Sequence, residues 1–171
     1  KDPVFNGNFA LAKCPVNIYA GVFNGTTFNT YPVSSTANTG VNAGKFKALP
    51  SNSNNKATTY ASGRVFVADT EGYYDFVSTV PETYAAYTSK LSGNPMSPYT
   101  GGIYWESADD AIAKIGSLAT KKVTLSAGVT ATQPVTVSSD TYTIDATAEG
   151  ASYDGLVTLK NASAKFVLEG E

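Results

Sequence analysis

The chain has 171 residues, enough for one ordinary domain or two small ones. Hydrophobic residues make up 42% of it and charged residues 15%, whereas typical soluble domains have roughly 25% charged residues. The formal net charge is −2 and no basic cluster exceeds Lys121-Lys122, which excludes the positive footprint that nucleic-acid binding requires. The sequence has no histidine, the commonest metal ligand and general base, and no run of about 20 apolar residues to insert into a membrane.

Serine, threonine, asparagine and glycine carry most of the polar character, and such a composition favours β-strands joined by turns. Cys14 is the single cysteine, so no disulfide can form within the chain. We expect its side chain to be buried as a small hydrophobe.

Two similar stretches near the N-terminus, Val16–Phe23 and Val41–Phe46, indicate a repeat. Each contains Val-Asn and then Ala-Gly-x-Phe, and the two Gly-x-Phe units lie 23 residues apart. Gly63–Phe66 resembles a third, degenerate copy. Repeats of this length predict stacked coils.

The middle of the chain contains a polar loop, a weak helix pattern and a boundary. The Asn-rich segment from Ser51 to Thr59 is typical of a loop. A short helix is predicted from Pro81 to about Leu91, because proline suits the first helical position and Tyr84 and Tyr87 would share a face with Leu91. The glycine- and proline-rich Ser92–Gly102 is the best boundary in the sequence.

The segment from Ser107 to Gly116 predicts an α-helix. Ser107 is a good N-cap, and Asp110 follows three residues later in a partial capping box. Asp109 and Asp110 lie at the positive end of the helix dipole, and Gly116 suits the C-terminal stop. The apolar residues share one face, which should lie on another surface: Ala108, Ala111, Ile112 and Ile115.

The C-terminal third repeats apolar residues at an offset of 22. The matched pairs are Val135 with Val157, Val137 with Leu159, Ile144 with Phe166 and Ala146 with Leu168. A period of 22 to 23 residues with short alternating strands fits one coil of a parallel β-helix, in which every second side chain points inward and stacks on the next coil. An antiparallel β-sandwich is the alternative.

The stretch from Tyr104 to Glu171 resembles the start of pectin-lyase-like right-handed β-helices. In that family a short amphipathic helix, seen here in residues 107–116, caps the open first coil, and a strand such as Lys122–Gly128 begins the coils. The resemblance implies an all-β, right-handed parallel β-helix whose capping α-helix prevents edge-to-edge pairing.

More narrowly, the chain resembles modules of large repeat-containing, adhesin-like surface proteins from gut-dwelling Gram-positive bacteria. Runs such as Ala20–Phe23 and Ala43–Phe46 occur towards the end of a β-helical unit there, and Gly63–Phe76 resembles the segment that closes the unit.

This resemblance implies a division of the chain into three parts. Residues 1–80 would be coils that close one unit, residues 81–100 a linker or short helix, and residues 101–171 the helix-capped start of another unit. One compact domain overall is the alternative.

The acidic residues do not form the clusters that catalysis needs. The one adjacent pair, Asp109-Asp110, is explained by the helix start, whereas polysaccharide hydrolysis uses paired carboxylates as acid and base. Cys14 has no histidine to activate it, and no Gly-x-Ser-x-Gly, phosphate loop or EF-hand occurs. We therefore expect no enzyme activity, no catalytic residues, no cofactor and no metal site.

Aromatic residues concentrate between residues 73 and 105. Because tyrosine and tryptophan anchor protein interfaces and stack on sugar faces, seven of them are candidate binding residues: Tyr73, Tyr74, Tyr84, Tyr87, Tyr99, Tyr104 and Trp105. A structural role, plugging a coil end or covering the junction between the halves, is the alternative.

We therefore expect a non-catalytic binding and structural module of a bacterial extracellular surface protein, secreted or attached to the cell wall. Its partner would be a host or bacterial surface protein, and the resemblance adds immunoglobulin or a mucosal protein as specific expectations. The alternative is a carbohydrate-binding module attached to a polysaccharide-degrading enzyme.

Overall fold

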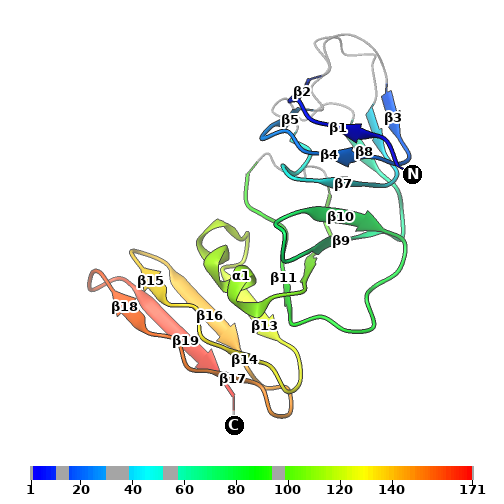
Figure 1. Cartoon of the computed structure of the whole chain (residues 1–171). Helices are drawn as coiled ribbons and strands as arrows, with labels where there is room; N and C mark the ends of the chain where they lie inside the picture. Colours follow the sequence, from blue (N-terminus) through cyan, green and yellow to red (C-terminus); the bar gives the residue numbers. More distant parts are fainter. Residues whose placement is uncertain (1, 11–15, 30–38, 52–57, 94–98, 171) are drawn as a thin grey trace. The chain divides into compact units, whose positions relative to one another are not determined.

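The computed structural model describes residues 2–10, 16–29, 39–51, 58–93 and 99–170 (Figure 1). Cys14, most of the Asn-rich loop and residues 94–98 of the predicted boundary lie outside the described residues. Two compact units form, one from Lys1–Val80 with Lys90–Gly101 (unit 1) and the other from Pro81–Ser89 with Gly102–Glu171 (unit 2). Within the described residues no helix is long and apolar enough to span a bilayer.

Parallel strands stack in unit 1 as the successive coils of a β-solenoid. Its strands are β1 (Val4–Phe5), β2 (Phe9–Ala10), β3 (Val16–Ile18), β4 (Val22–Phe23), β5 (Phe28–Asn29), β6 (Thr39–Val41), β7 (Gly44–Phe46), β8 (Thr58–Tyr60), β9 (Val65–Ala68) and β10 (Tyr74–Val77). Three parallel stacks result, namely β1-β4-β7, β2-β5 and β3-β6-β8, so the parallel β-helix is confirmed and the sandwich is wrong.

Phenylalanine rings stack in register from coil to coil along unit 1. The rings of Phe5, Phe23 and Phe46 stack in sequence, with centroids 4.9 and 5.1 Å apart and planes within 4° and 7° of parallel. Phe9 and Phe28 form a second stack at 4.6 Å. These distances match the spacing of neighbouring strands, which is about 4.7–4.9 Å, so each ring covers its equivalent one coil away. The repeat at an offset of 23 is thereby confirmed, because Phe23 lies opposite Phe46.

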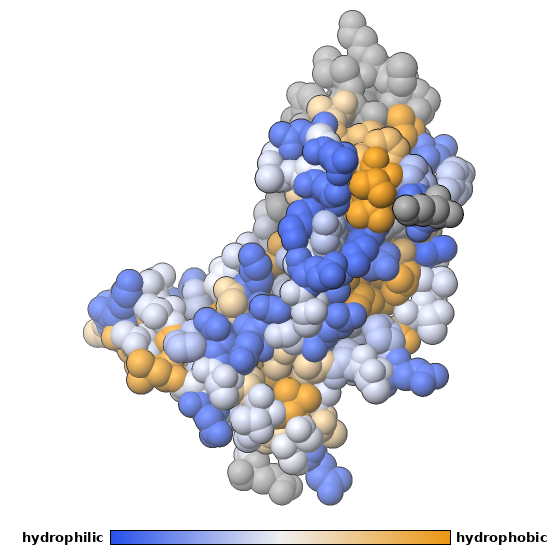
Figure 2. Space-filling model, in the orientation of Figure 1, coloured by the Kyte–Doolittle hydropathy of each residue, from blue (hydrophilic) through white to orange (hydrophobic). Residues whose placement is uncertain are grey.

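β1 is the edge strand of this stack. β1 pairs only with β4 among the described strands, and its Val4 and Phe5 side chains are exposed. Hydrophobic surface accordingly lies over β1 and β4 (Figure 2).

An antiparallel hairpin ends the parallel stack of unit 1. β10 runs antiparallel to both β7 and β9. The turn between β9 and β10 is held by Asp69, whose carboxylate accepts hydrogen bonds from the backbone N–H groups of Glu71 and Tyr73. The prediction that Gly63–Phe66 is a third copy of the repeat is therefore wrong, because the chain reverses here and Phe66 lies opposite Phe76.

Unit 2 also stacks parallel strands. Its elements are β11 (Ala86–Thr88), β12 (Ile103–Trp105), α1 (Ala108–Ala113), the 3-10 helix η1 (Ile115–Ser117), β13 (Lys122–Leu125), β14 (Thr130–Ala131), β15 (Val135–Val137), β16 (Thr141–Asp145), β17 (Ser152–Tyr153), β18 (Val157–Leu159) and β19 (Lys165–Glu169). β13, β16 and β19 form one parallel stack, and β14-β17 and β15-β18 form two more.

The predicted register of unit 2 is right in one stack and shifted in another. Val135 lies opposite Val157, as predicted. Ile144, however, lies opposite Leu168 rather than Phe166, an offset of 24. The turn at residues 160–164 is two residues longer than the turn at 138–140, which accounts for the shift. Because side chains alternate with a period of two, this shift keeps Ile144 on an inward-facing row.

The helix at residues 107–116 is confirmed, with slightly different ends. The Ser107 hydroxyl accepts a hydrogen bond from the Asp110 N–H at 3.1 Å, and the α-helix ends at Ala113 before the 3-10 turn that contains Gly116. Its buried residues pack on β11, β12, β13 and β14. The Asp109 carboxylate accepts hydrogen bonds from the N–H groups of Thr132 and Gln133 at 2.7 and 2.9 Å, so it fastens the helix to the turn after β14.

The predicted helix from Pro81 to about Leu91 is wrong, because this segment contains strand β11. β11 lies between β12 and β13 and runs antiparallel to both. Ala86 and Thr88 are buried whereas Tyr87 is exposed, which is the alternation of a strand. The Trp105 indole N–H donates to the Thr88 hydroxyl at 2.9 Å and satisfies the buried polar pair.

A side chain at the glycine of the Gly-x-Phe repeat should strain the backbone of unit 1. Gly44 has φ of +132°, and a Cβ atom there would lie 3.0 Å from Cζ of Phe46. Gly44→Ala should therefore lower the free energy of unfolding by about 1–3 kcal/mol, measured by urea denaturation. Gly7→Ala, where no heavy atom outside the adjoining residues lies within 4 Å of the added carbon, should change it by less than about 0.5 kcal/mol. Equal effects would contradict this account of the repeat.

Candidate binding groove

Two of the seven aromatic candidates are buried. Trp105 is 3% exposed and Tyr99 is 7% exposed. Tyr99 contacts the rings of Phe66 and Phe76 edge to face inside unit 1, whereas Trp105 lies in the core of unit 2. Their position favours the structural alternative for these two residues.

Tyr73 and Tyr74 also lie in unit 1. The Tyr73 hydroxyl donates to Asn24 Oδ1 at 2.9 Å, and the amines of Lys47 and Lys45 lie 4.4 and 5.0 Å from its ring centroid. Tyr74 is in β10, opposite Phe46. Tyr73 therefore makes its contacts within unit 1, at the end of the turn between β9 and β10.

The remaining three tyrosines of the candidate set come together in unit 2. The ring centroid of Tyr104 lies 4.8 Å from that of Tyr84 and 4.9 Å from that of Tyr87. Burial raises the pKa of the Tyr104 phenol, and the neighbouring Tyr87 and Tyr84 add to this effect. Tyr87 is 38% exposed, so one ring of the cluster presents a large open surface.

These tyrosines line a groove with a volume of about 660 Å³. Small-molecule sites typically have volumes of about 300–1,000 Å³. The residues that give the groove its chemical character are Glu82, Tyr84, Tyr87, Tyr104, Thr124 and Ser126, and we call it the tyrosine groove.

Strand pairing explains why these side chains meet. Tyr104 lies opposite Tyr87, and Tyr87 lies opposite Thr124 on the next strand. Because β12, β11 and β13 are adjacent, the three residues form one row on the outward face, while their neighbours along each strand point into the core. The same row continues through Asp145 and Glu169.

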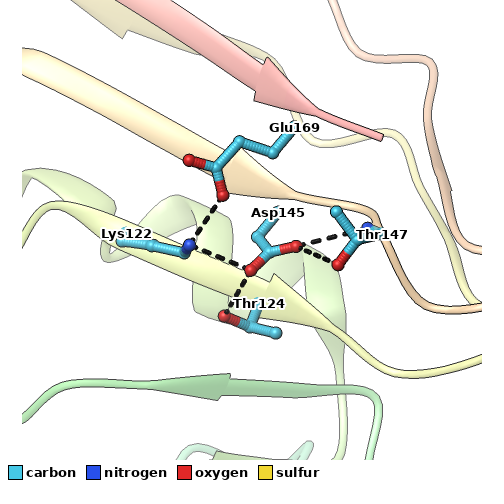
Figure 3. Close-up of polar contacts among 5 residues, drawn as sticks. All are labelled: Lys122, Thr124, Asp145, Thr147 and Glu169. Carbon is cyan, nitrogen blue, oxygen red and sulfur yellow. Dashed lines mark hydrogen bonds and ion pairs between the residues drawn. The ribbon is translucent and has the colours of Figure 1, made fainter. Parts of the chain in front are cut away.

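An ion-pair network holds the far end of this row (Figure 3). Nζ of Lys122 lies 2.9 Å from Oδ2 of Asp145 and 2.7 Å from Oε2 of Glu169. The other Asp145 oxygen accepts hydrogen bonds from the Thr147 hydroxyl and N–H at 2.7 and 3.2 Å. Hydrogen bonds to Glu169 and Asp145 raise the pKa of the Lys122 amine, so it stays protonated and is not a nucleophile.

Ser126 is the unusual polar residue of the tyrosine groove. Its backbone N–H donates to the Ala85 carbonyl at 3.0 Å. Its hydroxyl oxygen, in contrast, is buried and has no hydrogen-bond partner among the described residues. An unpaired buried hydroxyl lowers the free energy of unfolding by roughly 1–3 kcal/mol. Ser126 Oγ therefore either destabilises the fold or forms a hydrogen bond with a bound molecule.

Sequence reasoning found the three tyrosines but missed the polar half of the groove. Thr124 could have been found from the alternation in the strand at 122–125, because it is the polar position between Val123 and Leu125. Nothing in the sequence distinguishes Ser126 from the many other serines. Among the described residues no group of three His, Cys, Asp or Glu side chains is placed to hold a metal ion. The expected lack of catalytic residues, cofactor and metal stays a prediction.

The fold and the groove together define a β-solenoid with an outward-facing aromatic site. Comparison with protein-family models, with curated proteins and with solved structures finds no match to this chain. The parallel stacks support the resemblance to pectin-lyase-like modules at the level of the β-helix.

The unpaired hydroxyl predicts a stabilising substitution. Ser126→Ala removes a buried group that lacks a partner, so the free energy of unfolding should rise by about 1 kcal/mol. Ser107→Ala makes the same chemical change at the helix cap and should instead lower it by about 0.5–2 kcal/mol. Thermal and urea denaturation distinguish the two signs, and a destabilised Ser126→Ala would mean that the hydroxyl is paired.

The ion-pair network predicts how unit 2 responds to acid. Partial burial raises the pKa of Asp145, but hydrogen bonds from Lys122 and Thr147 outweigh it and hold the pKa below the ordinary 3.8. A depressed folded-state pKa gives stability that is present above about pH 4 and is lost as the pH falls through the folded value.

Asp145→Asn should therefore flatten the fall in unfolding free energy between about pH 5 and pH 2, measured by urea denaturation at each pH. Asp140→Asn, which removes an exposed carboxyl outside the network, is the matched comparison. An unchanged slope in Asp145→Asn would show that the network does not contribute.

Proposed function

We propose that this chain is a non-catalytic binding and structural module of a bacterial extracellular surface protein, with the tyrosine groove as its binding site for a host or bacterial surface protein. The observation that carries the proposal is the convergence of Tyr84, Tyr87 and Tyr104 around an open groove. Tyrosines in such a position are typical anchors of binding sites, because each offers a large amphipathic ring with few rotatable bonds.

The scaffold supports this role because it holds the anchors in place. Tyr87 and Tyr104 are on adjacent hydrogen-bonded strands, and the Tyr84 ring packs edge to face on Tyr104. Little side-chain freedom is then left to lose on binding. A preformed site of this kind retains more of its interaction energy as affinity.

The charges around the groove favour binding over catalysis. Hydrolysis of a glycosidic bond needs one carboxyl that keeps its proton near neutral pH. The nearest carboxylate in the row, Asp145, has a lowered pKa and is paired with Lys122, so it is ionised and engaged. Glu82 is the single acidic residue among those that line the groove.

The extracellular setting and the class of partner follow from the resemblance and from composition. A chain with 15% charged residues, many threonines and asparagines and a β-solenoid fold is consistent with a repeat-type surface protein. On this proposal the module is secreted or attached to the cell wall, and immunoglobulin and mucosal proteins are the first partners to test.

A capture experiment tests the proposal. The immobilised chain should retain proteins from host serum or mucus at micromolar concentration, and Tyr87→Ala should reduce the captured amount at least tenfold, because the most exposed ring of the groove is lost. Tyr19→Ala in unit 1, at a tyrosine that is 70% exposed, should have no effect. Capture that is absent, or equally strong in Tyr87→Ala, would refute the groove as the binding site.

A further inference from the structure

Resting on this proposed function, we propose further that the tyrosine groove recognises a neutral oligosaccharide carried by the partner, rather than a polypeptide surface. Four features of the groove support this ligand chemistry: the exposed aromatic ring, the hydroxyl groups beside that ring, the charge of the lining and one unpaired buried group.

The aromatic part of the groove suits the apolar face of a sugar ring. Tyr87 presents its open surface at the groove, and its ring is braced by Tyr104 at 4.9 Å. The C–H groups of a pyranose face can pack on such a ring, while its hydroxyls remain free to make hydrogen bonds at the edge. A flat, rigid platform next to polar groups is what this two-sided ligand requires.

The polar part of the groove offers groups that match sugar hydroxyls. The Thr124 hydroxyl lies in the same row as Tyr87, and Glu82 supplies a carboxylate at the groove. Ser126 Oγ is buried without a partner among the described residues. Rotation of the Ser126 side chain about χ1 would bring this hydroxyl to the groove that the residue lines. A sugar hydroxyl can both donate and accept, so it can then pair with Ser126 whichever way the serine proton points. The cost of the unpaired group is then removed on binding.

The charge of the groove selects against acidic ligands. Its lining contains Glu82 and no lysine or arginine. Lys122, which lies two residues before Thr124 on β13, is already shared between Asp145 and Glu169. An anionic sugar, such as a uronate or a sialylated chain, would meet negative charge without a free cation. A neutral chain avoids this repulsion.

The experiment uses the full chain and two kinds of probe. The first is immobilised oligosaccharides of galactose, mannose and N-acetylglucosamine, with sialylated counterparts. The second is mucus glycoprotein before and after enzymatic removal of its glycans. We expect retention of at least one neutral oligosaccharide over its sialylated counterpart, and loss of capture when the glycoprotein is deglycosylated.

Matched variants separate the role of the groove from folding. Tyr87→Ala should weaken oligosaccharide binding at least tenfold, whereas Tyr87→Phe should keep most of it because the ring remains. Ser126→Ala should weaken binding several-fold while the unfolding midpoint stays the same or rises. That opposite response of affinity and stability is not expected from a residue that only supports the fold.

Each outcome decides between the two proposals. Equal capture of the deglycosylated protein, still lost in Tyr87→Ala, would overturn the oligosaccharide inference and leave a protein ligand at the same groove. A preference for sialylated chains, or undiminished affinity in Ser126→Ala, would also overturn it. Failure to capture any glycan or any protein would remove the inference and the proposed function together.

Discussion

Register between successive parallel strands is the constraint on which this structure depends. Phe23 stacks on Phe46 in unit 1, and Val123 lies opposite Ile144 in unit 2. When inward side chains repeat in register, the outward side chains of the same strands must also form rows, because the alternation along a strand has a period of two. The parallel register of β13 and β16 thus places Thr124 opposite Asp145. The antiparallel pairing of β11 with β12 and β13 then adds Tyr104 and Tyr87 to the same row, and so places the tyrosines of the groove.

The β-helix and its capping helix could be predicted because their signals are local. Ser107 and the apolar positions after it specify a helix within one short window, and Val135 and Val157 match at a constant offset. The shifted pairing of Ile144 could not be predicted, since it depends on a turn two residues longer than its counterpart one coil earlier. A prediction from a constant repeat length assumes that all coils have the same number of residues, whereas the lengths of the turns differ from coil to coil.

Half of the candidate site was accessible to sequence reasoning for a related reason. Aromatic composition identified Tyr84, Tyr87 and Tyr104, but it could not separate them from Trp105 and Tyr99, which are buried. That separation depends on which face of a strand each residue occupies. The sequence predicted a helix at this segment, so it could not show that the Tyr87 side chain points outward from a strand. The strand β11 has only three residues and is stabilised by pairing with β12 and β13, which lie elsewhere in the sequence.

The path of the chain between the two units has a practical consequence. Residues 81–89, with β11, belong to unit 2, whereas the next residues, 90–101, return to unit 1 before the chain re-enters unit 2 at Gly102. The polypeptide thus passes between the units three times, and the units are interleaved rather than consecutive. Excision of residues 101–171 as an independent piece would omit β11, the strand that joins β12 to β13, along with Tyr84 and Tyr87 of the groove. Any truncation that aims to isolate this half must carry the earlier segment with it.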